Sequence, residues 1–312
     1  MLRLRGSMTA LVTPMRGGGV DEQALRSLAR WQIESGTDAL VPCGTTGEGA
    51  TLTAEEHARV VRACVEEARG RVPVIAGTGS NDTRRTIEST QRAKEAGADA
   101  ALVVTPYYNK PTPEGLFRHF EAVAKQGGLP VVMYNVPSRT SLDMLPETVA
   151  RCAKIPGVVG IKEASGSAPR IAEIQAAGVP QDFAILSGDD MFALATMALG
   201  GHGIISVVSN IAPADMAALS DAFFAGDLPR AQRAQVKFAG LVKAMFCETN
   251  PLPVKYALAK MGRIGPELRL PLTPISEAGA AKVDAAMREY GGAGFAGDGR
   301  SPQGGASNGG LL

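Results

Sequence analysis

The sequence has no surplus of charge, no long apolar run and no paired cysteines. Its 32 Lys and Arg residues nearly balance its 31 Asp and Glu residues, so the formal net charge is +1. This balance gives no electrostatic reason to expect nucleic acid or an anionic membrane as a partner. No apolar stretch approaches the roughly 20 residues of a membrane-spanning helix. The first residues also lack the apolar core and cleavage site of a secretion signal, so we expect a cytoplasmic protein.

Cysteine and histidine are too few and too scattered to suggest a disulfide framework or a metal site. The cysteines form no CxxC pair, and the histidines have no ligand-like spacing. We therefore expect reduced cysteines that act as small buried apolar residues, and no metal or other cofactor. The residues concerned are Cys43, Cys64, Cys152 and Cys247, with His57, His119 and His202.

What the sequence does contain is a repeated unit of an apolar strand, a polar or Gly-rich turn and an amphipathic helix. Eight continuous apolar runs, each followed by a helical pattern, indicate parallel strands joined by crossovers and predict a closed (β/α)8 TIM barrel. An open doubly wound sheet is the alternative, but it usually carries a Gly-rich phosphate fingerprint after its first strand, and Gly17-Gly18-Gly19 lacks that spacing. The strands are expected at residues 9–13, 39–43, 72–76, 100–105, 130–134, 158–163, 183–186 and 203–208.

After the eighth strand the pattern changes to helices alone. Helical segments are expected at residues 213–224, 228–246, 251–261 and 274–290. We assign residues 1–225 to the barrel and 226–290 to a C-terminal helical region packed on it. Residues 291–312 are rich in Gly, Ser and Pro without periodicity, which is typical of a disordered tail.

Lys162 lies where the sixth strand should present another apolar side chain. Burial of an unpaired ammonium is unfavourable, so a lysine in such a setting tends to lose its proton. A neutral amine is a nucleophile that forms Schiff bases with ketones and aldehydes. The alternative is a lysine at the exposed end of the strand. The first interpretation is favoured because the C-terminal ends of barrel strands carry the active site, and other polar groups follow the strands there.

The side chains that follow the other strands are of types that could bind and react with a small oxo acid. Thr45 and Thr46 offer hydroxyl and backbone N–H groups to a carboxylate, Tyr134 could move protons during imine formation, and Arg139 could bind a carboxylate in bidentate fashion. Taken singly, each has an ordinary explanation: a flexible turn, a core tyrosine or a solvated loop arginine.

Four motifs together resemble the pyruvate-dependent class I aldolase superfamily and, within it, the dihydrodipicolinate synthase family. The resemblance covers roughly residues 5–290. The motifs are Gly44-Thr45-Thr46-Gly47-Glu48, Tyr107-Tyr108-Asn109-Lys110-Pro111, Tyr134-Asn135-Val136-Pro137-Ser138-Arg139-Thr140 and Gly160-Ile161-Lys162-Glu163. The resemblance implies a Schiff-base-forming lyase that condenses pyruvate with L-aspartate 4-semialdehyde, in diaminopimelate and lysine biosynthesis.

The resemblance also implies roles for individual residues. Lys162 would form the Schiff base, and Tyr134, Thr45 and Tyr108 would form a proton relay, with Tyr108 reaching in from a neighbouring subunit. A relay shared in this way implies a homodimer, and the family is commonly a homotetramer. Thr46, Ile205 and Gly188 match substrate-binding positions, and Arg139 would bind the carboxylate of the semialdehyde.

A lysine feedback site is also implied. Lysine-sensitive relatives tend to have a histidine and a glutamate where this chain has Ala54 and Arg85. Because Arg85 would repel the ammonium of lysine, we expect weak or absent inhibition. The positions implied for the site are Gly49, Ala50, His57, Asn81, Arg85 and Tyr107.

Two other functions compete with this interpretation. A lyase similar to N-acetylneuraminate lyase, or a 2-keto-3-deoxy sugar-acid aldolase or dehydratase, would use the same barrel and lysine. Such enzymes usually lack the arginine motif found at Arg139. A barrel that binds a metabolite without turning it over is the non-enzymatic alternative.

Overall fold

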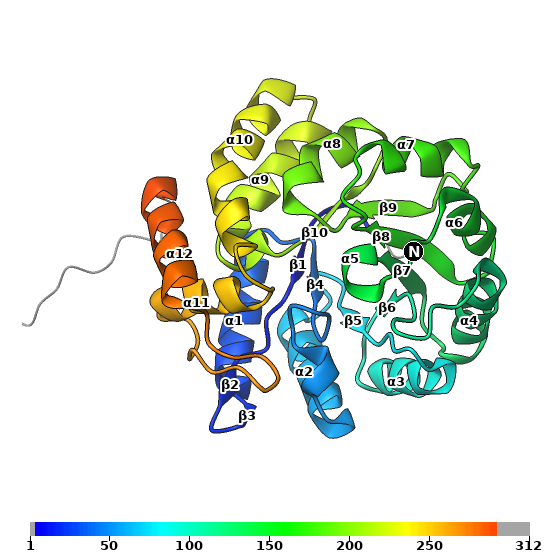
Figure 1. Ribbon diagram of the computed structural model, residues 1–312, viewed down its shortest axis with the longest axis horizontal. Coiled ribbons are helices and arrows are strands. Elements are labelled where there is room, and N and C mark those ends of the chain that lie inside the picture. The colour runs from blue at the N-terminus through cyan, green and yellow to red at the C-terminus, as the bar shows by residue number, and fades with distance from the viewer. Residues whose placement is uncertain (1–3, 292–312) are drawn as a thin grey trace, which may run out of the picture.

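The computed structural model describes residues 4–291, and its main element is an eight-stranded parallel sheet. The strand order is β4-β1-β10-β9-β8-β7-β6-β5. The two end strands meet through a parallel bridge between Leu40 and Val74, supported by a hydrogen bond from Leu40 N to Pro73 O of 3.0 Å. The sheet therefore closes on itself, and the expected (β/α)8 TIM barrel is confirmed (Figure 1). The barrel strands are β1 (Gly6–Ala10), β4 (Ala39–Val41), β5 (Ile75–Gly77), β6 (Ala100–Val104), β7 (Val131–Asn135), β8 (Val158–Glu163), β9 (Ala184–Ser187) and β10 (Gly203–Ser206).

Helices surround the barrel (Figure 1). Asp21 caps α1 by accepting from Ala24 N, and Thr53 forms a capping box with Glu56 at the start of α2. The helices are α1 (Glu22–Glu34), α2 (Ala54–Ala68), α3 (Thr83–Glu95), α4 (Pro113–Gln126), α5 (Pro137–Thr140), α6 (Pro146–Cys152), α7 (Pro169–Ala176), α8 (Ala193–Ala198) and α9 (Pro213–Phe224). Short additions are the hairpin strands β2 (Met15–Arg16) and β3 (Gly19–Val20) and the 3₁₀ helices η1 (Gly49–Thr51), η2 (Asp190–Phe192) and η3 (Val208–Asn210).

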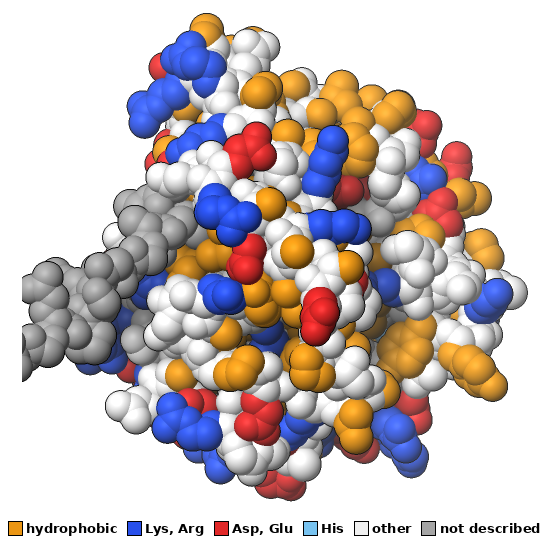
Figure 2. All heavy atoms as spheres, turned by 60° about the vertical axis from the view of Figure 1, so that its left-hand side comes forward, with side chains coloured by type: hydrophobic (Ala, Val, Ile, Leu, Met, Phe, Trp, Pro, Cys, Tyr) orange, Lys and Arg blue, Asp and Glu red, His pale blue; other side chains and the backbone are white. Residues whose placement is uncertain are grey.

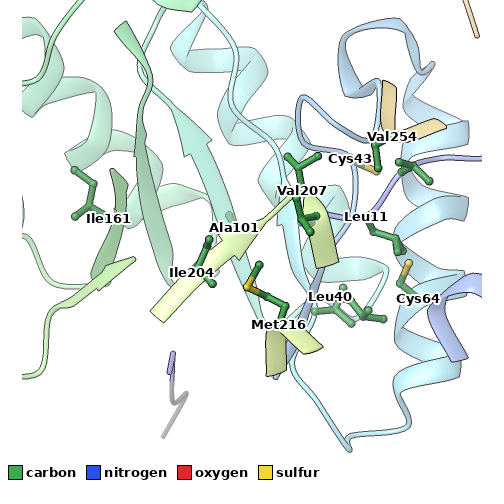
Figure 3. Close-up of a cluster of buried hydrophobic side chains, with 14 of the residues drawn as sticks. Leu11, Leu40, Cys43, Cys64, Ala101, Ile161, Ile204, Val207, Met216 and Val254 are labelled. Carbon is green, nitrogen blue, oxygen red and sulfur yellow. The ribbon is translucent and has the colours of Figure 1, made fainter. Parts of the chain in front are cut away.

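The C-terminal helices α10 (Leu228–Met245), α11 (Leu252–Lys260) and α12 (Glu277–Tyr290) lie together on one side of the barrel (Figure 1). In Figure 3, Val254 of α11 lies beside Cys43, which follows β4, and both belong to the large outer core cluster. The exact domain boundaries stay a prediction, and residues 292–312 of the expected disordered tail lie outside the described residues.

The first strand was placed too late in the chain by the apolar pattern. The pattern predicts residues 9–13, whereas β1 is Gly6–Ala10 and pairs with β10 from Gly6 to Thr9. Leu11 and Val12 are buried, but they lie beyond the strand, where Val12 N donates to Asn210 Oδ1 at 3.1 Å. The apolar character of Leu11 and Val12 therefore indicates that they are buried, but not that they belong to a strand.

Two core clusters reflect the alternation of side chains along each strand. The inner cluster fills the barrel and includes Met8, Val132, Tyr134 and Ile205. The outer cluster lies between strands and helices and includes Ile161 of β8. Because Ile161 faces outward, its neighbour Lys162 faces the barrel interior.

None of the helices among residues 4–291 has the length and apolar character needed to cross a membrane. On the face drawn in Figure 2, basic and acidic side chains are interspersed among polar and apolar ones.

Candidate active site

A cavity of about 220 Å³ lies at the carboxyl ends of the barrel strands. It is lined by residues that the sequence analysis singled out separately: Thr45, Thr46, Tyr134, Arg139, Lys162 and Gly188. Its volume suits a molecule of a few heavy atoms. The remaining lining residues are Ala10, Val41, Gly44, Leu102, Val136, Ser138, Ala164, Asp189, Val207, Phe246 and Asn250.

Lys162 is the chemically distinctive residue of this cavity. Its side chain faces inward from β8 and is only 5% exposed. Burial lowers its pKa from 10.5 to about 8, opposed by the charge of Asp190 and helped by the charge of Arg139. A pKa near 8 leaves about half of the amine neutral at pH 8, against roughly 0.3% for an ordinary lysine. The amine can therefore act as a nucleophile under mild conditions.

Tyr134 lies directly beside Lys162. The two residues are register partners on the neighbouring strands β7 and β8. The Lys162 Nζ lies 4.6 Å from the centroid of the Tyr134 ring. Burial raises the pKa of Tyr134, while the charge of Arg139 and a hydrogen bond with the Thr45 side chain act in the opposite direction. The phenol therefore stays protonated and can exchange a proton through Thr45.

The turn after β4 is held by the C-terminal helical region. Asn250 Nδ2 donates to Thr46 Oγ1 at 2.9 Å, and Arg139 Nη2 donates to the backbone oxygen of Asn250 at 3.3 Å. One residue of the segment before α11 thus contacts both the Thr46 turn and the Arg139 loop. No sequence signal marked Asn250, because it lies about 200 residues from Thr46 in a region without a motif.

Two residues further along the same turn, Glu48 lies in a fully buried ion pair with Lys255 of α11. Lys255 Nζ also donates to Thr13 O at 3.1 Å, and Arg269 N donates to the second carboxylate oxygen of Glu48 at 3.1 Å. Glu48 has a left-handed backbone with φ of +53°, so these contacts hold a conformation that a glutamate rarely adopts.

Gly188 gives Lys162 the space it needs. A Cβ at this position would lie 2.7 Å from Ala164 Cβ and 3.0 Å from Lys162 Cε. The chain therefore requires the absence of a side chain here for the Lys162 stem to take its position.

Asp190 is a buried carboxylate that the sequence analysis missed. It is fully buried and accepts hydrogen bonds from Ser206 Oγ and from Val207 N, the latter at 3.1 Å. Burial raises its pKa to about 6. Above that pH its negative charge acts on Lys162, whose pKa it raises.

Two of the residues assigned to the site do not line this cavity in the single chain. Ile205 is fully buried in the inner core, and Val207, two residues further on, lines the cavity. Tyr108 is 91% exposed, has a φ of +71° and does not line the cavity.

The positions expected for lysine binding lie around a second, larger cavity of about 730 Å³. It shares Thr45, Tyr134 and Arg139 with the Lys162 cavity. Gly49, Ala50, His57, Arg85 and Tyr107 line it. Asn81 is not among its lining residues, and its backbone oxygen accepts from Asn109 Nδ2 at 2.8 Å.

Among residues 4–291, no group of three or more His, Cys, Asp or Glu side chains is placed to hold a metal ion. His57 instead contacts Gly77 O through Nε2 at 2.7 Å, and His119 contacts Thr83 Oγ1 through Nδ1 at 2.9 Å.

Comparison with known proteins agrees with the motifs. Residues 3–290 match the profile of the Dihydrodipicolinate synthetase family. A 4-hydroxy-tetrahydrodipicolinate synthase of Anaeromyxobacter sp. (strain Fw109-5) is 58% identical over 291 residues, covering 93% of this chain and 99% of the relative. The enzyme of the same name from Nitratidesulfovibrio vulgaris is 54% identical over 284 residues, covering 90% and 97%.

A solved structure extends the likeness to three dimensions. The dihydrodipicolinate synthase of Acinetobacter baumannii, crystallised as a chloride-inhibited form in complex with pyruvate, superimposes with a TM-score of 0.89 at 47% identity. The match covers 93% of this chain and 99% of that one.

Proposed function

The chain belongs to the dihydrodipicolinate synthetase family, and we propose that its Lys162 cavity condenses pyruvate with L-aspartate 4-semialdehyde to give 4-hydroxy-tetrahydrodipicolinate. The enzyme is a Schiff-base-forming lyase that acts in diaminopimelate and lysine biosynthesis. The observation that carries this proposal is a buried amine with a lowered pKa in a small cavity that also contains Arg139.

The reaction begins with covalent capture of pyruvate. The neutral amine of Lys162 attacks C2, and the carbinolamine loses water to give an imine. Tyr134 donates the proton that the departing oxygen needs, and Thr45 connects the phenol to the next relay member. Thr46 and the backbone N–H groups of its turn bind the pyruvate carboxylate.

Carbon–carbon bond formation follows. Loss of a C3 proton converts the imine to an enamine, whose C3 attacks the aldehyde carbon of the second substrate, and the aldehyde oxygen becomes a hydroxyl group. Arg139 holds the carboxylate of that substrate. The substrate amine then attacks C2 and displaces Lys162, which closes the ring and frees the enzyme.

Borohydride trapping and a coupled assay test this function. Borohydride with pyruvate should add mass at Lys162, and Lys162→Ala should not trap. Arg139→Ala should reduce use of the semialdehyde far more than pyruvate capture. Turnover of N-acetylneuraminate or a 2-keto-3-deoxy sugar acid in place of aspartate semialdehyde would contradict the assignment.

We further propose a homodimer, assembled into a homotetramer, in which Tyr108 of one subunit completes the relay of the other. The support is the exposure of Tyr108 on a stiff loop between Pro106 and Pro111, together with the fact that it does not line the cavity of its own chain. The cytoplasmic location expected from the sequence stays a prediction.

Mixed dimers test the sharing of Tyr108. Lys162→Ala and Tyr108→Phe should each be nearly inactive alone. If they are mixed and allowed to exchange subunits, one site of each mixed dimer regains both groups, so roughly one quarter of wild-type activity should return. No recovery, despite mixed dimers seen by native mass spectrometry, would contradict a shared site.

A further inference from the structure

Asn250 lines the Lys162 cavity, and its buried side-chain oxygen has no hydrogen-bond partner among residues 4–291. We propose that this oxygen, Asn250 Oδ1, accepts a hydrogen bond from the amino group of the second substrate and makes the site selective for a carboxylate-bearing aldehyde with an amino group next to the carboxylate. The inference rests on the proposed function and assigns a specificity-determining residue to it.

The position of the amide is fixed by its other contacts. Asn250 is 6% exposed and lines the cavity that contains Lys162. Its Nδ2 donates to Thr46 Oγ1 at 2.9 Å, and Thr46 is itself 3% exposed. None of residues 4–291 donates a hydrogen bond to Asn250 Oδ1. A buried acceptor without a donor is unfavourable, so this oxygen is suited to a donor brought by a ligand.

Only one of the two substrates has an N–H group that can donate a hydrogen bond to Asn250 Oδ1. Pyruvate has a keto oxygen and a carboxylate, both of which are acceptors, so it has no N–H to offer Asn250. Aspartate semialdehyde has an amino group that donates whether it is charged or neutral. The requirement for a donor therefore points to the second substrate.

The neighbourhood of Asn250 also fits an α-amino acid. Arg139, the proposed carboxylate ligand, donates through Nη2 to the backbone oxygen of the same residue at 3.3 Å. An α-amino acid has its amino group on the carbon next to the carboxylate, so it needs a donor and an acceptor close together. Arg139 and the Asn250 amide supply them side by side.

A neutral acceptor is the better choice in the cavity that also contains Lys162. A carboxylate at position 250 would also bind an amino group, but its negative charge would favour the protonated lysine. The amide accepts the hydrogen bond without weakening the nucleophile. This difference between amide and carboxylate can be measured.

The decisive experiment compares aspartate semialdehyde with succinate semialdehyde, which lacks only the amino group. In Asn250→Ala, the KM for aspartate semialdehyde should rise about 10- to 150-fold, the range for a lost hydrogen bond to a charged group. Competitive inhibition by succinate semialdehyde should change less than about two-fold, because it never used that bond. Borohydride trapping of pyruvate should fall by a smaller factor than this rise in KM, because on the pyruvate side only the contact of Asn250 with Thr46 is lost.

Asn250→Asp supplies a second readout at nearly the same side-chain size. It keeps an acceptor, so it should retain more of the preference for the amino-bearing aldehyde than Asn250→Ala does. Its added charge should move the pH dependence of pyruvate capture to higher pH. Lys243→Ala, an exposed change in the same helical region, is the matched control and should alter neither quantity.

Each other outcome overturns the inference in a recognisable way. Equal weakening of both aldehydes would mean that the side chain acts through Arg139, and a loss of pyruvate trapping as large as the rise in KM would mean that it acts through Thr46. Unchanged kinetics would leave the oxygen without a role in recognition. If the wild-type enzyme traps pyruvate but does not turn over aspartate semialdehyde, the proposed function itself fails, and this is seen before any variant is made.

Discussion

Adding one methyl group at Gly188 should impair covalent capture of pyruvate while leaving the fold in place. The added Cβ would lie 2.7 Å from Ala164 Cβ, 3.0 Å from Lys162 Cε and 3.2 Å from Lys162 Cγ. The backbone of Gly188 is not in the left-handed region, so Gly188→Ala introduces a steric conflict and no backbone strain. Ala164 has no rotatable side chain, so its contact can be relieved only by a backbone shift, whereas the two contacts with Lys162 are relieved by movement of its flexible stem.

The size of the effect follows from that displacement. Overpacking of this kind destabilises a protein by about 1–3 kcal/mol. Moving a nucleophile by about 1 Å from its attack geometry can reduce the rate by about 100-fold. We therefore expect a 10- to 100-fold slower imine formation with a modest loss of stability.

The assay is single-turnover trapping of pyruvate by borohydride, followed by mass spectrometry, with the melting temperature measured in parallel. Gly240→Ala is the matched control, because a Cβ there would meet only Glu289 Oε2, at 3.9 Å, on the surface of α10. It should trap pyruvate at the wild-type rate and melt at the same or a slightly higher temperature.

An unchanged trapping rate in folded Gly188→Ala would refute the reasoning, since it would show that Lys162 does not depend on the space at Gly188. A large loss of melting temperature without slower trapping per folded molecule would equally contradict it, because the conflict would then be relieved elsewhere in the barrel.

Three further predictions concern charge. The rate of pyruvate capture should rise with pH through about 8, because only the neutral Lys162 amine attacks. In folded Asp190→Asn this rise should move to lower pH, because the lost carboxylate had raised the pKa of Lys162. A shift to higher pH would contradict this explanation. Lys255→Met should lower the free energy of unfolding, measured in urea, by about 3–5 kcal/mol, because it leaves the buried Glu48 carboxylate unpaired. The double variant Lys255→Met with Glu48→Gln should lose less stability, because it removes both charges. Equal losses in the two variants would show that the pair is not coupled. Lysine should inhibit weakly or not at all, because Arg85 lines the second cavity; half-inhibition at sub-millimolar lysine in the coupled assay would exclude this.

Local sequence patterns determined the architecture and several of the site's chemical groups. Continuous apolar runs located the barrel strands, with the starts of β1 and β5 displaced by three residues. Lys162 stood out because a charged residue interrupted an apolar strand, and strand alternation then fixed the direction of its side chain.

Tertiary structure alone decided which residues of the C-terminal region support the turn after β4. Asn250 contacts Thr46 across 204 residues, and Lys255 pairs with Glu48 across 207. By sequence, Lys255 is an ordinary lysine on an amphipathic helix, and Asn250 is one polar residue before a proline. Periodicity reports only whether a position faces the core or solvent, whereas these contacts depend on where the C-terminal helices dock on the barrel. The pairing of distant polar groups is set by that docking, and no local pattern encodes it.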